Sequence, residues 1–126
     1  MKCGCIAVFA KTPELSSVKT RLAEKVGPEK AQEIYKLCIN SIQNTLQEFA
    51  SLRPEWDISW ALAEEGAPDN DFWKSRPFQK MWTGTGALGT RLHTVYSDLR
   101  LKYKRVILIG TDSPQLTAFH LINATE

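Results

Sequence analysis

The chain has 126 residues, of which 43% are hydrophobic and 24% charged, the balance of an ordinary soluble globular domain. A net charge of +2 argues against the broad basic surface that nucleic-acid-binding proteins use. No segment approaches the roughly 20 apolar residues needed to span a membrane. Cys3, Cys5 and Cys38 have the spacing of neither a disulfide framework nor a zinc site, so we expect reduced thiols and a cytoplasmic protein.

The first half of the chain predicts two strands and two helices. An apolar run over residues 5–9 indicates a buried strand, and Ser16 and Ser17 can cap a short helix that ends at Gly27. Pro28 suits the first turn of the next and longest helix. Alternation over residues 56–62 predicts a second strand. The apolar positions of the long helix follow helical spacing: Ala31, Ile34, Tyr35, Cys38, Ile42, Leu46 and Phe49.

The second half predicts two further strands around a helix. Residues 64–77 read as a loop with one helical turn near 71–73, followed by a short strand over 78–82. A glycine-rich segment, 84–89, leads into a helix, and residues 105–110 form the clearest strand in the sequence. A last helix is expected over about 117–125. The first of these helices is predicted to bury Leu88, Leu92, Val95 and Leu99.

This order of elements predicts the fold class. Strands alternating with helices are typical of an α/β domain with three layers, α/β/α, and a mainly parallel sheet. If the strand over 106–109 is outermost, its apolar edge is unpaired, which proteins normally avoid. Either the chain is a fragment or truncated form, or another chain covers that edge, as in a homodimer.

Cations follow the first strand. Lys11, Lys19 and Arg21 lie in and just after the loop at its carboxyl end, where ligands bind in open α/β sheets. A loop that enters a helix also offers backbone N–H groups to a phosphate. The alternative is that these side chains are solvated charges on a loop and a short amphipathic helix.

Asp112 is the strongest single candidate for chemistry. It ends an apolar strand and precedes Ser113-Pro114, so it is expected in the same crevice as the first loop. Carboxylate oxygens suit Mg²⁺ or Mn²⁺, which bind through one or two carboxylates and substrate phosphates. Asp112 can also cap the following helix, and the sequence leaves both roles open.

Gly84, Gly86 and Gly89 have the Gly-x-Gly-x-x-Gly spacing of dinucleotide-binding turns, but they follow a short third strand instead of a strong first one. A neutral interpretation is that the glycines allow a flat ligand, such as a base or ribose, to approach the backbone. Arg91, one turn into the helix, could contact a phosphate. The alternative is a glycine-rich turn with Arg91 in solvent.

Four sequence blocks together resemble a bacterial glycosyltransferase A-like family, whose members are described as nucleotide-diphospho-sugar transferases. The blocks are Phe-Ala-Lys-Thr-Pro at 9–13, Val-Lys-Thr-Arg-Leu at 18–22, Gly-Ala-Leu-Gly-Thr-Arg-Leu at 86–92 and Leu-Ile-Gly-Thr-Asp-Ser-Pro at 108–114. The family is similar in outline to small guanylyltransferases. The resemblance covers nearly the whole chain.

The resemblance implies a GT-A fold, a nucleotide-sugar or nucleoside triphosphate donor, an acceptor that it leaves unidentified, and Mg²⁺ or Mn²⁺. Lys11, Lys19 and Arg21 would hold the donor phosphates, and Asp112 would coordinate the metal. Residues of the glycine-rich segment would lie against the nucleoside: Gly86, Ala87, Leu88 and Gly89.

The sequence also departs from the family pattern. Leu15-Ser16 stands where Pro-Gly is common, and Thr85 and Ala87 stand where Gln and Asp are usual. A later Asp-Gly-Gly-type block and the acceptor half are absent, so residues 1–126 are expected to be one nucleotide-binding domain that lacks the C-terminal acceptor half. The leading hypothesis is a metal-dependent nucleotide-diphospho-sugar transferase. The alternatives are a nucleotidyltransferase of the guanylyltransferase type and a non-catalytic, degenerate nucleotide-binding domain.

Overall fold

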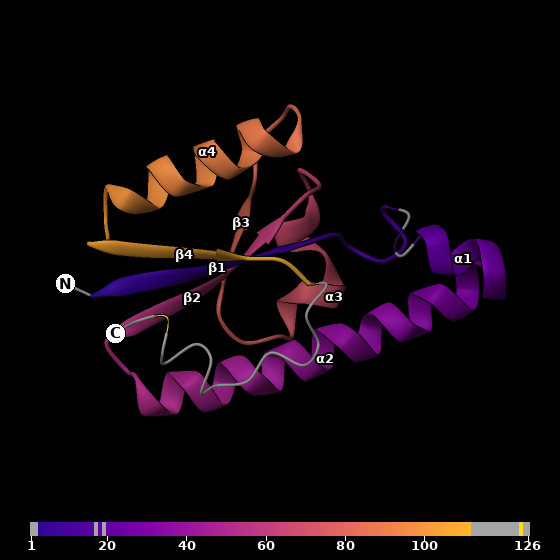
Figure 1. The fold of residues 1–126 in the computed structure, drawn as a ribbon, viewed down its shortest axis with the longest axis horizontal. Coiled ribbons are helices and arrows are strands. Elements are labelled where there is room, and N and C mark those ends of the chain that lie inside the picture. Colours follow the sequence, from indigo (N-terminus) through magenta and orange to yellow (C-terminus); the bar gives the residue numbers. More distant parts are fainter. Residues whose placement is uncertain (1–2, 17, 19, 112–123, 125–126) are drawn as a thin grey trace.

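The computed structural model describes residues 3–16, 18, 20–111 and 124, and the helix expected over 117–125 lies outside them except for residue 124. Strands and helices alternate along the chain, as the sequence predicts (Figure 1). The elements are β1 (Gly4–Ala10), α1 (Thr20–Val26), α2 (Pro28–Leu52), β2 (Trp56–Leu62), the 3₁₀ turn η1 (Ala67–Asp69), α3 (Asp71–Lys74), β3 (Gln79–Trp82), α4 (Leu88–Arg100) and β4 (Arg105–Ile109).

The four described strands form one sheet in the order β3-β2-β1-β4, and every pair is parallel. The predicted mixed α/β fold is therefore confirmed. From β1 the chain builds outward to β2 and β3, and then returns to place β4 on the other side of β1. The strand order thus reverses between β1 and β4, which is the place where open parallel sheets bind ligands beyond the strand ends.

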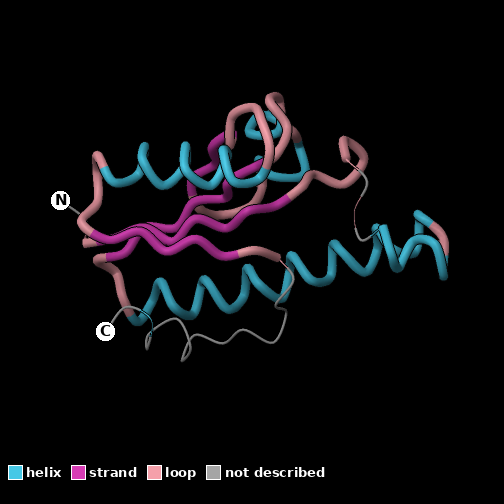
Figure 2. Tube along the Cα trace, turned by 45° about the horizontal axis from the view of Figure 1, so that its top comes forward, coloured by secondary structure: helices cyan, strands magenta, loops and turns pink. Residues whose placement is uncertain are grey.

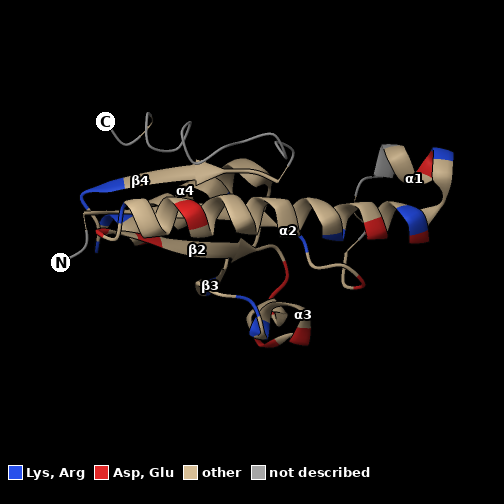
Figure 3. Cartoon of the chain, turned by 90° about the horizontal axis from the view of Figure 1, so that it is seen from below, with Lys and Arg blue, Asp and Glu red and all other residues tan. Residues whose placement is uncertain are grey.

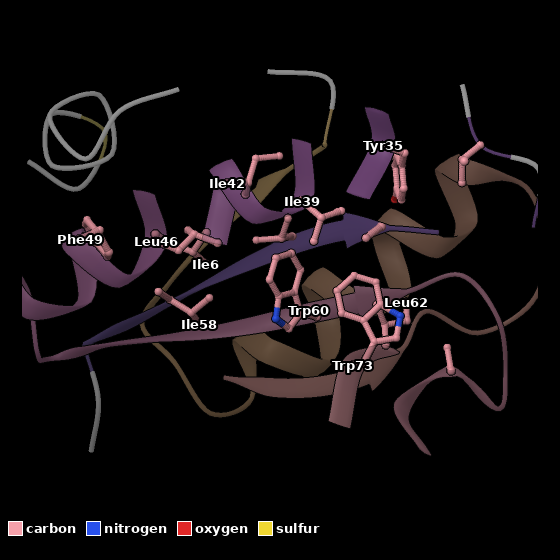
Figure 4. Packing of buried hydrophobic residues seen from close by; sticks show 14 of the residues in the cluster. Ile6, Tyr35, Ile39, Ile42, Leu46, Phe49, Ile58, Trp60, Leu62 and Trp73 are labelled. Atoms are coloured by element: carbon pink, nitrogen blue, oxygen red, sulfur yellow. The ribbon is translucent and has the colours of Figure 1, made fainter. Parts of the chain in front are cut away.

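Helices cover both faces of the sheet, and this gives the predicted three layers (Figure 2). The long helix α2 packs on one face through Tyr35, Ile39, Ile42, Leu46 and Phe49, and α4 packs on the other through Val95 and Leu99. Figure 4 shows the α2 side chains lying over Ile6, Ile58 and Trp60. Because water reaches neither face of the central strands, β1 and β2 bury both sets of their side chains.

Burial along residues 56–62 does not alternate as the sequence predicts, because helices cover both faces of the strand. Ile58, Trp60 and Leu62 are buried against α2, but Ser59 and Ala61, on the opposite face, are buried as well. A strand between two helical layers does not need a polar face.

The helices differ from prediction in detail. The short helix α1 begins at Thr20, later than the predicted cap at Ser16 and Ser17. In α2, Ile39 is fully buried, whereas Ile34 and Cys38 are only half-buried. In α4, the predicted burial of Leu88 is wrong: the side chain is 64% exposed, because it occupies the first helical residue at the end of the sheet.

Charges of both signs are interspersed on the outer surfaces of α1 and α2 (Figure 3). None of the described helices is long and apolar enough to cross a membrane. Within the described residues β4 is an outer strand and pairs only with β1, as expected, and its residues Val106–Ile109 are half-buried. It stays a prediction that a homodimer forms through this edge. The same holds for the assignment of residues 1–126 as one nucleotide-binding domain that lacks the acceptor half.

Candidate functional site

The loop after β1 is held by a tyrosine of α2. The Tyr35 hydroxyl accepts a hydrogen bond from the backbone N–H of Lys11 at 2.9 Å and donates one to the carbonyl oxygen of Lys11, also at 2.9 Å. The backbone of Lys11 is therefore fixed from both sides, while its side chain is exposed. The ammonium has no hydrogen bond or ion pair within the described part of the chain, so it is available to an anion.

The same loop is bound to the segment after β2. Both carboxylate oxygens of Glu64 accept from the backbone N–H of Thr12, at 3.1 and 3.0 Å, and the hydroxyl of Ser16 donates to Oε2. Thr12 is fully buried, and its Oγ1 accepts a hydrogen bond of 2.8 Å from the indole N–H of Trp73 in α3. Tyr35 of α2, Glu64 after β2 and Trp73 of α3 thus fix the path of the loop after β1.

The glycine-rich segment forms the turn that enters α4. Gly86 has a φ of 105°, and a Cβ added there would lie 3.3 Å from two side-chain carbons of Thr90. Gly84 also has a positive φ, of 86°. The helix begins at Leu88, so the predicted order of turn and helix is confirmed.

Arg91 connects this turn to two strand ends. Its Nε donates to the carbonyl oxygen of Gly86 at 2.9 Å, and its Nη1 donates to the carbonyl oxygen of Ala63 at 2.7 Å and to Oγ1 of Thr83 at 3.0 Å. Ala63 follows β2 and Thr83 follows β3. Arg91 is therefore held in place by backbone and hydroxyl acceptors, and the predicted alternative of a solvated side chain is wrong.

These segments enclose a cavity of about 560 Å³ at the carboxyl ends of the strands. Its apolar part comes mainly from strand residues and from the start of α4, and its polar part from the surrounding loops, α2 and α4. The apolar residues include Phe9, Ala61 and Leu88. The polar ones include Lys11, Ser16, Tyr35, Thr83, Arg91 and Thr111. A volume of this size is typical of a small-molecule site.

The structure brings several predicted site residues together. Lys11, Gly86, Leu88 and Arg91 all line this cavity, although they come from sequence positions up to 80 apart. Ala87 and Gly89 lie in the same turn and helix start but are not among the lining residues.

The other predicted residues are not placed at the cavity. Lys19 and Asp112 lie outside the described residues, and Arg21 belongs to α1 but its side chain is not described. Thr111, directly before Asp112, lines the cavity. Among the described residues no cluster of three His, Cys, Asp or Glu side chains could hold a metal ion.

Sequence reasoning misses Tyr35 and Glu64. The helical pattern assigns Tyr35 to the core, and it is buried there, but its hydroxyl reaches the loop. Glu64 stands in the sequence only as the first residue of a loop. Its position two residues after a parallel strand is the available signal, since neighbouring strand ends meet at one edge.

A second cavity of about 620 Å³ lies next to the first. It shares Ser16 and Val18 with the first cavity and is otherwise lined by α1, α2 and the preceding loop, including Glu14 and Glu24. The two cavities therefore adjoin at Ser16 and Val18.

The chain is similar to a protein of known structure and to a family of bacterial proteins. A crystal structure from Desulfovibrio desulfuricans G20, described as a "putative nucleotide-diphospho-sugar transferase", matches this chain with a TM-score of 0.80 and 26% identity. The match covers 98% of this chain and 53% of that protein, so the chain spans about half of its length. No curated protein matches the chain. The family described as "uncharacterized protein conserved in bacteria" (DUF2064) matches residues 45–126, more than half of the chain, and the protein belongs to that bacterial family.

Proposed function

We propose that this chain forms the nucleotide-binding part of a nucleotide-diphospho-sugar transferase that uses a divalent cation. The observation that carries the proposal is the cavity at the reversal of strand order, bordered by the exposed ammonium of Lys11 and by the Gly86 turn. The likeness to the Desulfovibrio protein, at 26% identity, supports a nucleotide-sugar as the donor.

The cavity has a polar and an apolar side that suit the two ends of a nucleotide. Lys11 offers an exposed cation to phosphate oxygens, and charge-assisted hydrogen bonds of this kind are stronger than neutral ones. Leu88, exposed at the start of α4, and Phe9 offer apolar contact to a base or ribose. Gly86 has a positive φ and no side chain, so a ligand can approach the backbone at this position of the turn.

Arg91 contributes differently from a direct phosphate ligand. Its Nε and Nη1 hydrogens are directed at Gly86, Ala63 and Thr83, so the guanidinium holds the walls of the cavity together. Its positive charge still lies at the cavity and favours an anionic ligand.

The described lining residues do not by themselves provide the ligands that a divalent metal needs. No described lining residue is an Asp or a Glu, and the oxygens of Glu64 are taken by Thr12 and Ser16. Asp112 follows the lining residue Thr111 directly, so we propose Asp112 and the donor phosphates as the metal ligands. A metal held there would stabilise negative charge on the departing phosphate.

The test is calorimetric titration of the protein with UDP, GDP, CDP and GTP, each with and without Mn²⁺. We expect one nucleotide to bind, and Asp112→Ala to remove the contribution of the metal. Lys11→Met should weaken binding about tenfold or more, since it removes one charge-assisted contact. The matched controls are Asp98→Ala and Lys30→Met, which replace exposed charges of the same kind on α4 and α2.

The outcomes separate the alternatives. Tight binding of GTP over all three diphosphates would favour the guanylyltransferase type. Metal-independent binding that Asp112→Ala leaves unchanged would favour a non-catalytic nucleotide-binding domain. If no nucleotide binds under any condition, the proposal is wrong for this chain.

A further inference from the structure

We propose that Glu64 is a positioning residue that holds the loop carrying Lys11 in the arrangement required for binding the phosphates of the donor. The inference rests on the proposed function and adds to it a residue that does not itself line the cavity. It also assigns a purpose to a half-buried carboxylate beside a site for anions.

The carboxylate closes the loop after β1. Glu64 accepts the Thr12 N–H at 3.0 and 3.1 Å and the Ser16 hydroxyl, so one side chain joins two loop positions four residues apart. Between them, Glu14 has a φ of 78°, a conformation that non-glycine residues seldom adopt. Such a backbone persists when surrounding contacts fix it.

Fixing Thr12 fixes its neighbour. Lys11 precedes Thr12, and its own N–H and carbonyl group are bonded to Tyr35. The Lys11 backbone is thus held by α2 on one side and, through Thr12, by the end of β2 on the other. The side chain of Lys11 therefore extends from a fixed backbone position at the cavity rim. Less conformational entropy is then lost when the loop binds an anion.

Simple electrostatics predicts the opposite effect of removing Glu64. A carboxylate near bound phosphates repels them, so its loss alone should strengthen nucleotide binding. A positioning role predicts that binding weakens, because the loss of loop order outweighs the loss of repulsion. The direction of the change therefore distinguishes the two roles.

The experiment compares Glu64→Ala and Glu64→Gln with Glu65→Gln, which removes the neighbouring exposed carboxylate. The affinity of each for UDP, GDP and CDP is measured with Mn²⁺. We expect Glu64→Ala to weaken binding about tenfold, and Glu64→Gln less, since its amide oxygen can still accept from Thr12. Glu65→Gln should bind as the unaltered protein does.

A double-mutant cycle shows whether Glu64 acts through Lys11. We expect the Lys11→Met, Glu64→Ala variant to bind hardly more weakly than Lys11→Met alone. Fully additive losses, or unchanged or tighter binding by Glu64→Ala, would overturn the proposal. Thermal unfolding of both Glu64 variants shows whether the fold is kept, and Glu64→Gln serves where Glu64→Ala fails to fold.

Hydrogen exchange separates this inference from the proposed function. We expect the Thr12 amide to exchange about tenfold faster in Glu64→Ala, with the amides of β1 unchanged. If the unaltered protein binds no nucleotide, the proposed function fails, and the ligand-positioning role fails with it even where Thr12 exchange accelerates. If the protein binds a nucleotide but neither Thr12 exchange nor affinity changes, the positioning role alone is wrong.

Discussion

Gly86 is a residue at which the candidate site tolerates little change. Its φ of 105° lies where L-amino acids are strained, and an added Cβ would press on Thr90 at 3.3 Å. Its carbonyl oxygen accepts from Arg91, so any shift of the turn also disturbs the guanidinium that joins β2 to β3.

We predict that Gly86→Ala lowers the free energy of unfolding by about 1–2 kcal/mol, because the new methyl group enforces an unfavourable backbone. It should also weaken nucleotide binding, since the turn borders the cavity. Chemical denaturation and calorimetric titration measure the two effects.

Gly89→Ala is the matched control. Gly89 lies in the first turn of α4 without a positive φ, and a Cβ added there would meet no atom within 4 Å. Because alanine favours helices more than glycine does, this variant should be as stable as the unaltered protein or up to about 1 kcal/mol more stable. Equal destabilisation by both substitutions would contradict the argument from φ.

At the scale of elements, the short helix α3 supports the loop after β1. Asn70 caps α3 by accepting the N–H of Phe72 at 2.9 Å, and Trp73 inserts fully into the core beside Trp60 (Figure 4). From there its indole N–H reaches Thr12 of the loop. An element of four residues therefore helps to fix the residue next to Lys11.

Trp73→Phe should cost more stability than Trp82→Phe, although the two substitutions remove the same atoms. The first deletes the donor to the buried Thr12 hydroxyl, whereas the buried indole N–H of Trp82 has no hydrogen-bond partner among the described residues. Removing an unsatisfied donor relieves a desolvation cost. We expect a difference of about 1–2 kcal/mol between the two free energies of unfolding, measured by urea denaturation.

Trp73→Phe should also accelerate hydrogen exchange of the Thr12 amide, and Trp82→Phe should not. If both variants lose the same stability, the hydrogen bond to Thr12 contributes nothing measurable, and the support of the loop by α3 is then only through apolar packing.

Local sequence patterns are enough to predict the order and bounds of most elements. The strands over 56–62 and 105–110 and the helix from Pro28 agree with the structure within a few residues of their ends, because each has a strong period or a clear terminator. Lys11, Gly86 and Arg91 can be found because they follow strands or enter a helix, and parallel strands bring such segments together.

What local patterns cannot supply are contacts between distant segments. The hydroxyl of Tyr35 reaches across 24 residues to Lys11, and Glu64 reaches across 52 to Thr12. The burial of Ser59 depends on a helix that lies later in the chain, and the exposure of Leu88 on where the sheet ends. Each is a property of the packed layers and leaves no trace in a short window of sequence.

At the scale of the whole molecule, the two ends of the sheet differ in structure. The carboxyl ends of the strands carry the cavity. Near the opposite end, the buried side chains of Cys5 and Tyr103 lie beside the half-buried Asp57 on the α4 side of the sheet. The Tyr103 hydroxyl donates to Oδ2 of Asp57 at 2.6 Å, and the fully buried thiol of Cys5 lies in the same cluster.

This cluster predicts a loss of stability at high pH. Burial raises the pKa of Cys5 to about 12, with a smaller contribution from the Asp57 charge, and burial together with the Asp57 hydrogen bond raises the pKa of Tyr103 to about 12. In the unfolded chain the two groups titrate near their ordinary pKa values of 9 and 10. Below about pH 8 both states keep the protons, and stability does not depend on these groups.

Above pH 9 the unfolded chain releases protons that the folded chain retains, so the free energy of unfolding falls as the pH rises toward 12. We expect a loss of the order of 2–4 kcal/mol between pH 9 and pH 11, measured by urea denaturation at each pH. Tyr103→Phe should flatten the part of the curve above pH 10, because phenylalanine has no proton to lose. Tyr96→Phe, at an exposed tyrosine of α4, should leave the curve unchanged. A stability that stays constant from pH 8 to pH 11 would mean that the folded chain releases these protons as readily as the unfolded one, and that water reaches this end of the sheet.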